Sequence, residues 1–181
     1  MKKLVSIVGV FFLAIILLTG CGKDNENTTK KVDSSEINSS EQNKDIDTSG
    51  TGKLSCTRNA DAGEGIDVSL RYELQYQDGI VLNLYSEEKI TTEDRSTLDE
   101  YEEAYKKIAA NYKGLDYYNF NLTRTDNSVM NTIDIDYQKV DINKLLDIEG
   151  EEDNVIEDGK VKLKTWLTFA EQFGTVCEEV S

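Results

Sequence analysis

The residue with the clearest potential for chemistry is Cys21, which ends the run Leu18-Thr19-Gly20-Cys21. Two lysines open the chain, an apolar stretch follows them, and small residues come directly before the cysteine. Together these features resemble a lipobox, the signal at which bacterial prolipoproteins are lipidated on the cysteine thiol and cleaved. We therefore expect a signal peptide over residues 1–20, cleavage after Gly20 and lipid attachment at Cys21.

The apolar stretch from Leu4 to Leu18 is short for a permanent membrane span. As a helix it would reach roughly 22 Å, whereas the hydrocarbon core of a bilayer is about 30 Å thick. Two or three acyl chains on Cys21 would anchor the mature protein stably. We expect it at the cell membrane, lipid-anchored on the extracytoplasmic face; the alternative is a plain secretory signal with an incidental cysteine.

The two remaining cysteines, Cys56 and Cys177, lie near the two ends of the expected domain. A pair of cysteines in an exported protein is typical of a disulfide. The bond would close a 121-residue segment, for which the chain-entropy model gives roughly 5 kcal/mol of stabilisation. Two separate buried thiols are the alternative. A catalytic thiol is disfavoured because the chain has no histidine to activate it.

Acidic residues offer oxygen ligands at two places. Asp134 and Asp136 share one face of an expected strand, and the segment 149–158 is rich in Glu and Asp. Such oxygens suit calcium, but the EF-hand spacing is missing because Val155 and Asp158 occupy its last two ligand positions. Paired carboxylates also serve glycoside hydrolysis, for which a domain of this size offers little room. We interpret the acidic segment as a solvated loop, with calcium binding as the alternative.

Composition excludes several classes of function. The chain has no His, which rules out His-based triads and the usual zinc sites. Its formal charge is −15, and loss of Lys2 and Lys3 with the signal peptide makes that of the mature chain about −17. Such an acidic surface argues against nucleic acid and against electrostatic adhesion to membranes. The sequon Asn121-Leu122-Thr123 is interpreted as a chance match.

Between Cys21 and the domain runs a polar segment whose only large apolar residues are Val32, Ile37 and Ile46. It contains too little apolar surface to form a core, so residues 21–52 are predicted to be a disordered tether. A flexible coil of this length has a root-mean-square reach of roughly 30 Å. Residues 53–181 are then long enough for a single domain.

Two pairs of strands are predicted from alternating apolar and polar residues. The first pair alternates over residues 66–76 and again from Ile80 to Leu84, on either side of the turn residues Asp78-Gly79. The second alternates over 118–122 and 133–137, separated by the turn residues 126–128. Residues 54–58 form a further candidate strand.

Helical spacing places Leu98, Tyr101, Tyr105, Ile108 and Tyr112 on one stripe. We interpret this stripe as core packing and predict a helix from residue 92 or 97 to residue 113, capped by Thr92 or by Thr97 with Glu100. A short helix near 145–148 and another over 163–173 complete the pattern. The fold class is therefore predicted to be α+β, an antiparallel sheet of two β-hairpins packed against two main helices.

The helix that ends at Tyr112-Lys113-Gly114 is followed by a strand pair that includes the run Asn131-Thr132-Ile133-Asp134-Ile135-Asp136-Tyr137-Gln138-Lys139-Val140-Asp141. In this arrangement the chain resembles the YehR-like lipoproteins over residues 53–176. The resemblance implies an α+β domain of unassigned function on a lipidated N-terminus, and it supplies no catalytic residues. The pair Cys56 and Cys177 departs from that family pattern.

From these observations we expect a membrane-anchored, non-enzymatic binding domain of the cell envelope, without catalytic residues, metal ligands or cofactor. Its partners would be the membrane, through the lipid, and an envelope protein or a cell-wall polymer. The alternatives are a small-molecule receptor lipoprotein and an inhibitor of a secreted hydrolase.

Overall fold

The computed structural model describes residues 46–150 and 155–180. Its strands are β1 (Thr51–Asp61), β2 (Asp67–Gln77), β3 (Ile80–Thr91), β4 (Tyr118–Arg124), β5 (Ser128–Asp136), β6 (Ile156–Glu157), β7 (Lys160–Val161) and β8 (Val176–Glu179), and its helices are α3 (Arg95–Asn111), α4 (Ile142–Glu149) and α5 (Leu163–Gln172). The predicted Cys21 and Gly20 sites lie outside the described residues. None of the described helices has the length and apolar character needed to span a bilayer.

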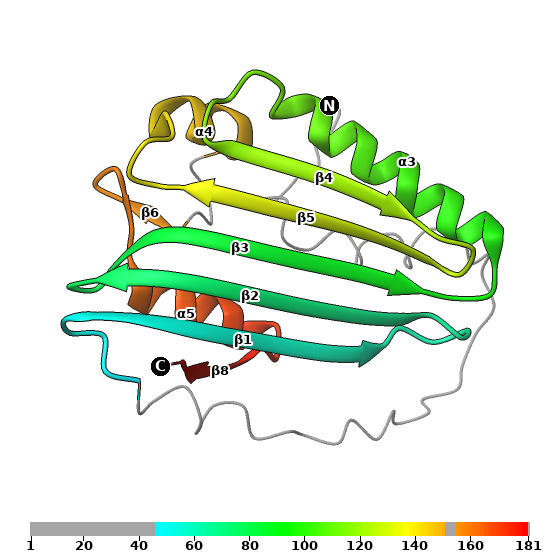
Figure 1. Ribbon diagram of the computed structural model, residues 1–181, viewed down its shortest axis with the longest axis horizontal. Coiled ribbons are helices and arrows are strands. Elements are labelled where there is room, and N and C mark those ends of the chain that lie inside the picture. Colours follow the sequence, from blue (N-terminus) through cyan, green and yellow to red (C-terminus); the bar gives the residue numbers. More distant parts are fainter. Residues whose placement is uncertain (1–45, 151–154, 181) are drawn as a thin grey trace, which may run out of the picture.

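Six strands form one antiparallel sheet in the order β4-β5-β3-β2-β1-β8 (Figure 1). The predicted α+β class with an antiparallel sheet is confirmed. The finer prediction was incomplete, because β1 extends the first hairpin to three strands, β8 is added at the edge and a third helix, α4, is present. Strand β8 was missed because four residues after a helix carry too little pattern.

Alternation within the strands divides the sheet into two faces. On the inner face, Leu54 and Cys56 of β1 and Leu70, Tyr72 and Leu74 of β2 are buried. Cross-strand partners share a face, so the register carries this division across the whole sheet. The other face, here called the outer face, carries the alternate polar residues.

The described long helices lie on the inner face. Trp166 of α5 packs edge-on against Tyr72 with 5.5 Å between ring centroids, and α3 contacts β3, β4 and β5. Figure 1 shows α5 behind β1 and β2, and α3 running alongside β4 at the opposite edge of the sheet from β8. The helical stripe Leu98, Tyr101, Tyr105 and Ile108 is buried, so its interpretation as core is confirmed.

Local sequence explains where these elements turn. Asp78 and Gly79 both have positive φ, the requirement of a type I′ hairpin turn. The register then shifts, because Tyr76 pairs with Val81 while Gln75 pairs with Asn83. Leu82 is the extra residue of this bulge, which makes the predicted alternation from Ile80 to Leu84 wrong: Val81 is buried instead.

Two predicted boundaries also differ from the structure. Strand β1 begins at Thr51, two residues before the predicted domain start, and the Tyr76 hydroxyl donates a hydrogen bond to the Asp47 carbonyl at 3.0 Å. Helix α3 is capped by Asp94, whose carboxylate accepts from the Ser96 amide at 3.0 Å, rather than by Thr92 or Thr97. Asp is among the strongest N-cap residues because its side chain satisfies an orphan amide.

Candidate binding surface

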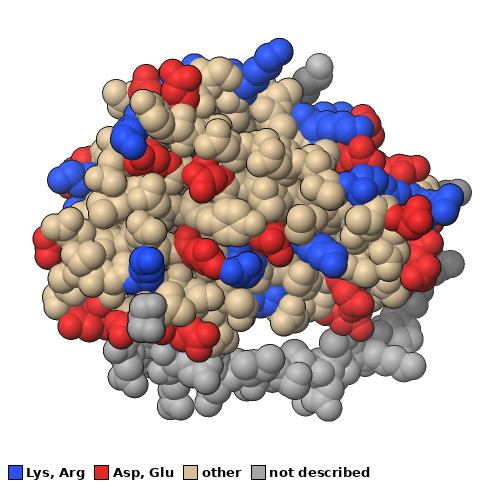
Figure 2. Space-filling view, in the orientation of Figure 1, with Lys and Arg blue, Asp and Glu red and all other residues tan. Residues whose placement is uncertain are grey.

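The outer face is a broad polar surface, and the described helices α3 and α5 do not pack on it. Strands β1, β2 and β3, each eleven or twelve residues long, dominate it. Its charged residues on β1, β2, β3 and β5 are Asp61, Asp67, Glu73, Glu87, Asp134 and Asp136 on the acidic side and Lys53, Arg71 and Lys89 on the basic side. Figure 2 shows both signs interspersed among uncharged residues across this view. The surface is thus mixed, with an excess of acid.

Several of these charged residues have a side-chain partner nearby. Arg71 forms an ion pair with Glu73 on the same strand. The Tyr85 hydroxyl donates to Glu87 at 3.2 Å, and Lys139 Nζ lies 2.7 Å from Asp136. Hydrogen bonding by Lys139 lowers the pKa of Asp136 below its ordinary value. At the C-terminal end of β1 and the N-terminal end of β2, no ion pair among the described residues includes Asp61 or Asp67, and the Asp61 carboxylate accepts a hydrogen bond from the Gly63 amide at 2.7 Å.

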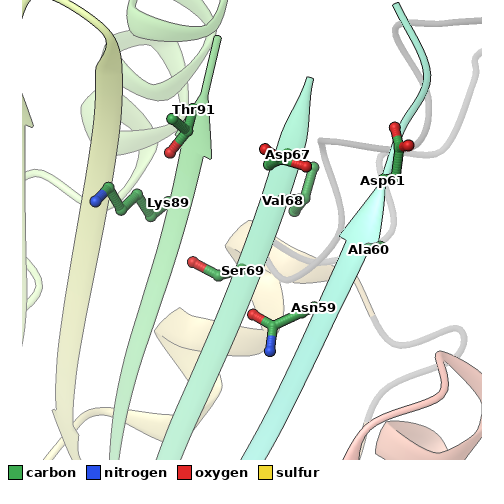
Figure 3. A pocket seen from close by; sticks show the side chains of 8 residues that line it. All are labelled: Asn59, Ala60, Asp61, Asp67, Val68, Ser69, Lys89 and Thr91. Atoms are coloured by element: carbon green, nitrogen blue, oxygen red, sulfur yellow. The ribbon is translucent and has the colours of Figure 1, made fainter. Parts of the chain in front are cut away.

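An open hollow of about 390 Å³ lies at that end (Figure 3). Register brings its outer-face side chains into two rows: Asp61, Asp67 and Thr91 form one row, and Asn59, Ser69 and Lys89 form the other. Figure 3 shows Asn59 and Ser69 pointing toward the neighbouring strand, whereas the Lys89 ammonium turns away toward β5.

The chemistry of this hollow is that of hydrogen bonding. Its carboxylates accept, its hydroxyls and amide both donate and accept, and together they suit a polar surface. Ser69 is the hollow's candidate nucleophile, but a serine needs an adjacent base, and the ammonium of Lys89, the basic residue that lines the hollow, turns away from it toward β5 (Figure 3). The geometry therefore fits recognition better than covalent catalysis.

A second hollow of about 470 Å³ lies between the β2–β3 turn, the segment after β5 and the β6–β7 hairpin. Gln77, Asp78, Tyr137, Gln138 and Lys160 contribute its polar groups, and Ile80, Val81, Leu82 and Val161 make the rest largely apolar. It lies at the opposite end of β2 from the first hollow. The adjoining ends of β2 and β3, the strand β7 and the turn residues Asp78 and Gly159 form it.

The inner face holds one buried carboxyl group, that of Glu88. Burial raises its pKa to about 7, while the Asn131 amide, the Tyr105 hydroxyl and the charge of Arg58 each oppose this shift. Neither hollow described above is lined by Glu88. We therefore assign Glu88 to the core. The alternation of β3 in the sequence indicates this buried position, because Ser86 and Glu88 stand where apolar residues would continue the buried series from Leu84 to Ile90.

The structure joins Cys56 to Cys177, with 3.9 Å between their Cα atoms. The two cysteines are direct partners in the antiparallel pairing of β1 with β8. The bond fixes a four-residue edge strand to the sheet. The pairing of β1 with β8 thus places residues 121 apart in sequence next to each other.

The structure places Asp134 and Asp136 on one face of a strand, as predicted, and describes only part of the acidic loop. Asp134 and Asp136 lie on the outer face of β5, and residues 151–154 of the acidic loop lie outside the described part of the chain. Among residues 46–150 and 155–180, no group of three His, Cys, Asp or Glu side chains is arranged to hold a metal ion. Calcium binding by the whole loop stays a prediction.

Comparison with known families adds to this picture. A family model described as a protein of unknown function, DUF1307, matches residues 56–174. The chain belongs to this family. The predicted resemblance to a YehR-like domain of unknown function is thereby confirmed. The matched region begins at Cys56 and ends three residues before Cys177, so the disulfide links the two ends of the DUF1307 domain.

Two solved structures are similar to the chain. The NMR structure of the Escherichia coli YehR protein has 20% sequence identity and a TM-score of 0.48, and the match covers 74% of this chain and 93% of that one. An NMR structure of a protein from Streptococcus pneumoniae TIGR4 has 14% identity and a TM-score of 0.47, covering 88% of this chain and all of that one. Among curated proteins, no sequence matches this DUF1307 protein.

Proposed function

We propose that this DUF1307 protein is a lipid-anchored, non-enzymatic binding domain that contacts a partner protein of the bacterial cell envelope through the outer face of its sheet. One observation carries the proposal: the described long helices pack on the inner face, and the outer face remains a broad, rigid, polar surface with a hollow at one end. Antiparallel sheets with one solvated face are common, so the hollow and its polar rows are what favour recognition.

The charge of the chain favours a protein partner over an anionic polymer. Acidic residues exceed basic ones in the chain as a whole and on the outer face. Polyanionic wall polymers would be repelled by such a surface, whereas a protein with basic groups would be attracted. Nucleic acid is disfavoured for the same reason.

The anchor is supported by the sequence around Cys21. Lipid on Cys21 would leave a polar segment between the bilayer and Thr51, where the first strand begins. The segment is long enough for the sheet to approach partners at a distance from the membrane surface. Labelling bacteria with a palmitate analogue tests this step: the full chain should incorporate label, and a Cys21→Ser variant should not.

The binding proposal is tested by capture from bacterial membranes. The full chain, tagged at its C-terminus, is recovered from detergent-solubilised membranes and compared with Ser69→Trp, which fills the hollow, and with Ala110→Trp on an exposed position of α3. A specific partner should be lost with Ser69→Trp and kept with Ala110→Trp. Equal capture by the two variants, or nothing captured above a Cys21→Ser control, would contradict the proposal.

A further inference from the structure

The described strands cover only part of the edge of β1, and the rest is called the uncovered edge below. Strand β8 pairs with Leu54 to Thr57, and β1 continues from Arg58 to Asp61 without a described strand on that side. Figure 1 shows β8 beside the first part of β1 and the rest of the strand projecting beyond it. An uncovered strand edge presents a row of unpaired backbone groups, which is a template for another strand.

The hydrogen-bonding pattern identifies which groups these are. The Val180 amide donates to the Lys53 carbonyl on the β8 side at 3.0 Å. The Ala62 amide donates to the Ile66 carbonyl on the β2 side at 2.8 Å. Because antiparallel strands alternate their bonding sides, the odd-numbered residues of β1 bond toward β8 and the even-numbered ones toward β2. Asn59 and Asp61 therefore direct their backbone amides and carbonyls to the uncovered edge.

The side chains beside this edge define the chemistry of a strand that would fit. Asn59 and Asp61 are exposed on the outer face, and Asp67 lies next to Asp61 in the same row of the hollow. Residues opposite each other in an antiparallel pair share a face. A residue opposite Asp61 would thus lie next to one carboxylate, which also accepts a hydrogen bond from the Gly63 amide, and two strand spacings, about 10 Å, from a second. This position suits a long basic side chain, Lys or Arg.

We propose that the uncovered edge of β1 from Arg58 to Asp61 binds an extended, basic segment of a partner protein as an added strand, placed end to end with β8. The inference rests on the proposed function and names the part of the partner that the surface accepts. Backbone hydrogen bonds to Asn59 and Asp61 supply affinity, and Asp61 with Asp67 selects basic side chains on the outer face.

The test uses the full chain in non-ionic detergent and a short fluorescent peptide in which lysine alternates with valine. Anisotropy should show saturable binding that weakens with salt. Asn59→Pro removes the edge amide at a position where an edge strand tolerates proline, and it should weaken binding at least about tenfold. The matched control Asn59→Ala keeps the amide and should bind like the parent chain.

A second measurement uses the unmodified chain, so its result does not depend on whether Asn59→Pro folds. A peptide of the same sequence, N-methylated at alternate amides on its bonding side, cannot donate to the edge and should bind at least about tenfold more weakly to the unmodified chain. Asp61→Asn should also weaken binding of the lysine peptide, and a peptide with glutamate in place of lysine should not bind.

The proposal is overturned if the N-methylated peptide binds as well as its parent, or if Asn59→Pro folds and binds unchanged. It is also overturned if sedimentation shows a dimer that Asn59→Pro dissociates, because a second copy would then occupy the edge. The proposed function fails separately: its test is the loss of the membrane partner with Ser69→Trp, which does not depend on the lysine peptide.

Discussion

Asn131 Nδ2 donates a hydrogen bond to Glu88 Oε2 at 3.1 Å, and the two residues are direct cross-strand partners between β5 and β3. Both side chains are buried. The contact satisfies part of the hydrogen-bonding capacity of this buried carboxyl group. It does not remove the cost of burying charge, because the pKa of Glu88 is still raised to about 7.

This raised pKa predicts how stability depends on pH. An unfolded Glu side chain releases its proton around its ordinary pKa of 4.5, whereas folded Glu88, with a pKa of about 7, keeps its proton to higher pH. The contribution of Glu88 to stability is therefore present below pH 4.5, is lost as the pH rises from 4.5 to 7, and is constant above that. The loss is about 3 kcal/mol.

Glu88→Gln isolates this effect, since glutamine resembles the protonated acid. Urea unfolding at several pH values should show the variant gaining stability relative to the parent between pH 4.5 and 7. Groups with lowered pKa values, such as Asp94 and Asp136, remain in both proteins and cancel in the difference. A difference that does not change with pH would contradict the raised pKa of Glu88.

Loss of the Cys56–Cys177 bond should destabilise the domain. Replacing both cysteines with alanine removes a link across 121 residues, and the chain-entropy model predicts a loss of about 5 kcal/mol in the free energy of unfolding. Guanidinium unfolding measures it, with the reduced parent as a second sample. Mass spectrometry of the oxidised parent should find two hydrogens fewer than in the reduced protein; equal masses would show that the bond does not form.

Gly52 is predicted to resist substitution because it faces Tyr76 across the β1–β2 pair. A Cβ at this position would overlap the Tyr76 ring, which is buried and bonded to the Asp47 carbonyl. Gly52→Ala should lower the free energy of unfolding by about 1–3 kcal/mol. Thr51→Ala, one residue earlier, is the control, and a double variant that adds Tyr76→Leu should recover part of the loss.

The N-cap of α3 gives a further prediction. Asp94→Ala removes the side chain that accepts from the Ser96 amide and from the Thr97 hydroxyl, and it should cost about 1 kcal/mol in thermal or urea unfolding. Asp99→Ala, on an exposed position later in the helix, should cost less. An effect of Asp94→Ala no larger than that of Asp99→Ala would argue against the cap.

Sequence patterns predicted the main elements where local and tertiary preferences agree. Strand β2 alternates without interruption, so its buried face could be predicted. The buried face of β3 could not be predicted from alternation, because the bulge at Leu82 depends on pairing with β2. Strand β8 is four residues long and exists because β1 and the disulfide hold it, which no local pattern reveals.

The composition of the candidate binding surface was harder to predict from the sequence than the elements were. Asp67 and Ser69 could be identified as outward-facing polar residues of a strand, but nothing in the sequence places Asn59 and Lys89 beside them. Their proximity follows from the register of three strands. The uncovered edge of β1 likewise follows from the length of β8, so both features needed the structure.

Binding of the partner by the outer face can be observed residue by residue in amide NMR spectra of the isotope-labelled chain in detergent, recorded while the partner captured from membranes is added. Shifts and line broadening should concentrate at Asn59, Asp61, Asp67 and Ser69 and their neighbours on β1 and β2. Changes concentrated on α3 or α5, with these strands unaffected, would contradict binding by the outer face.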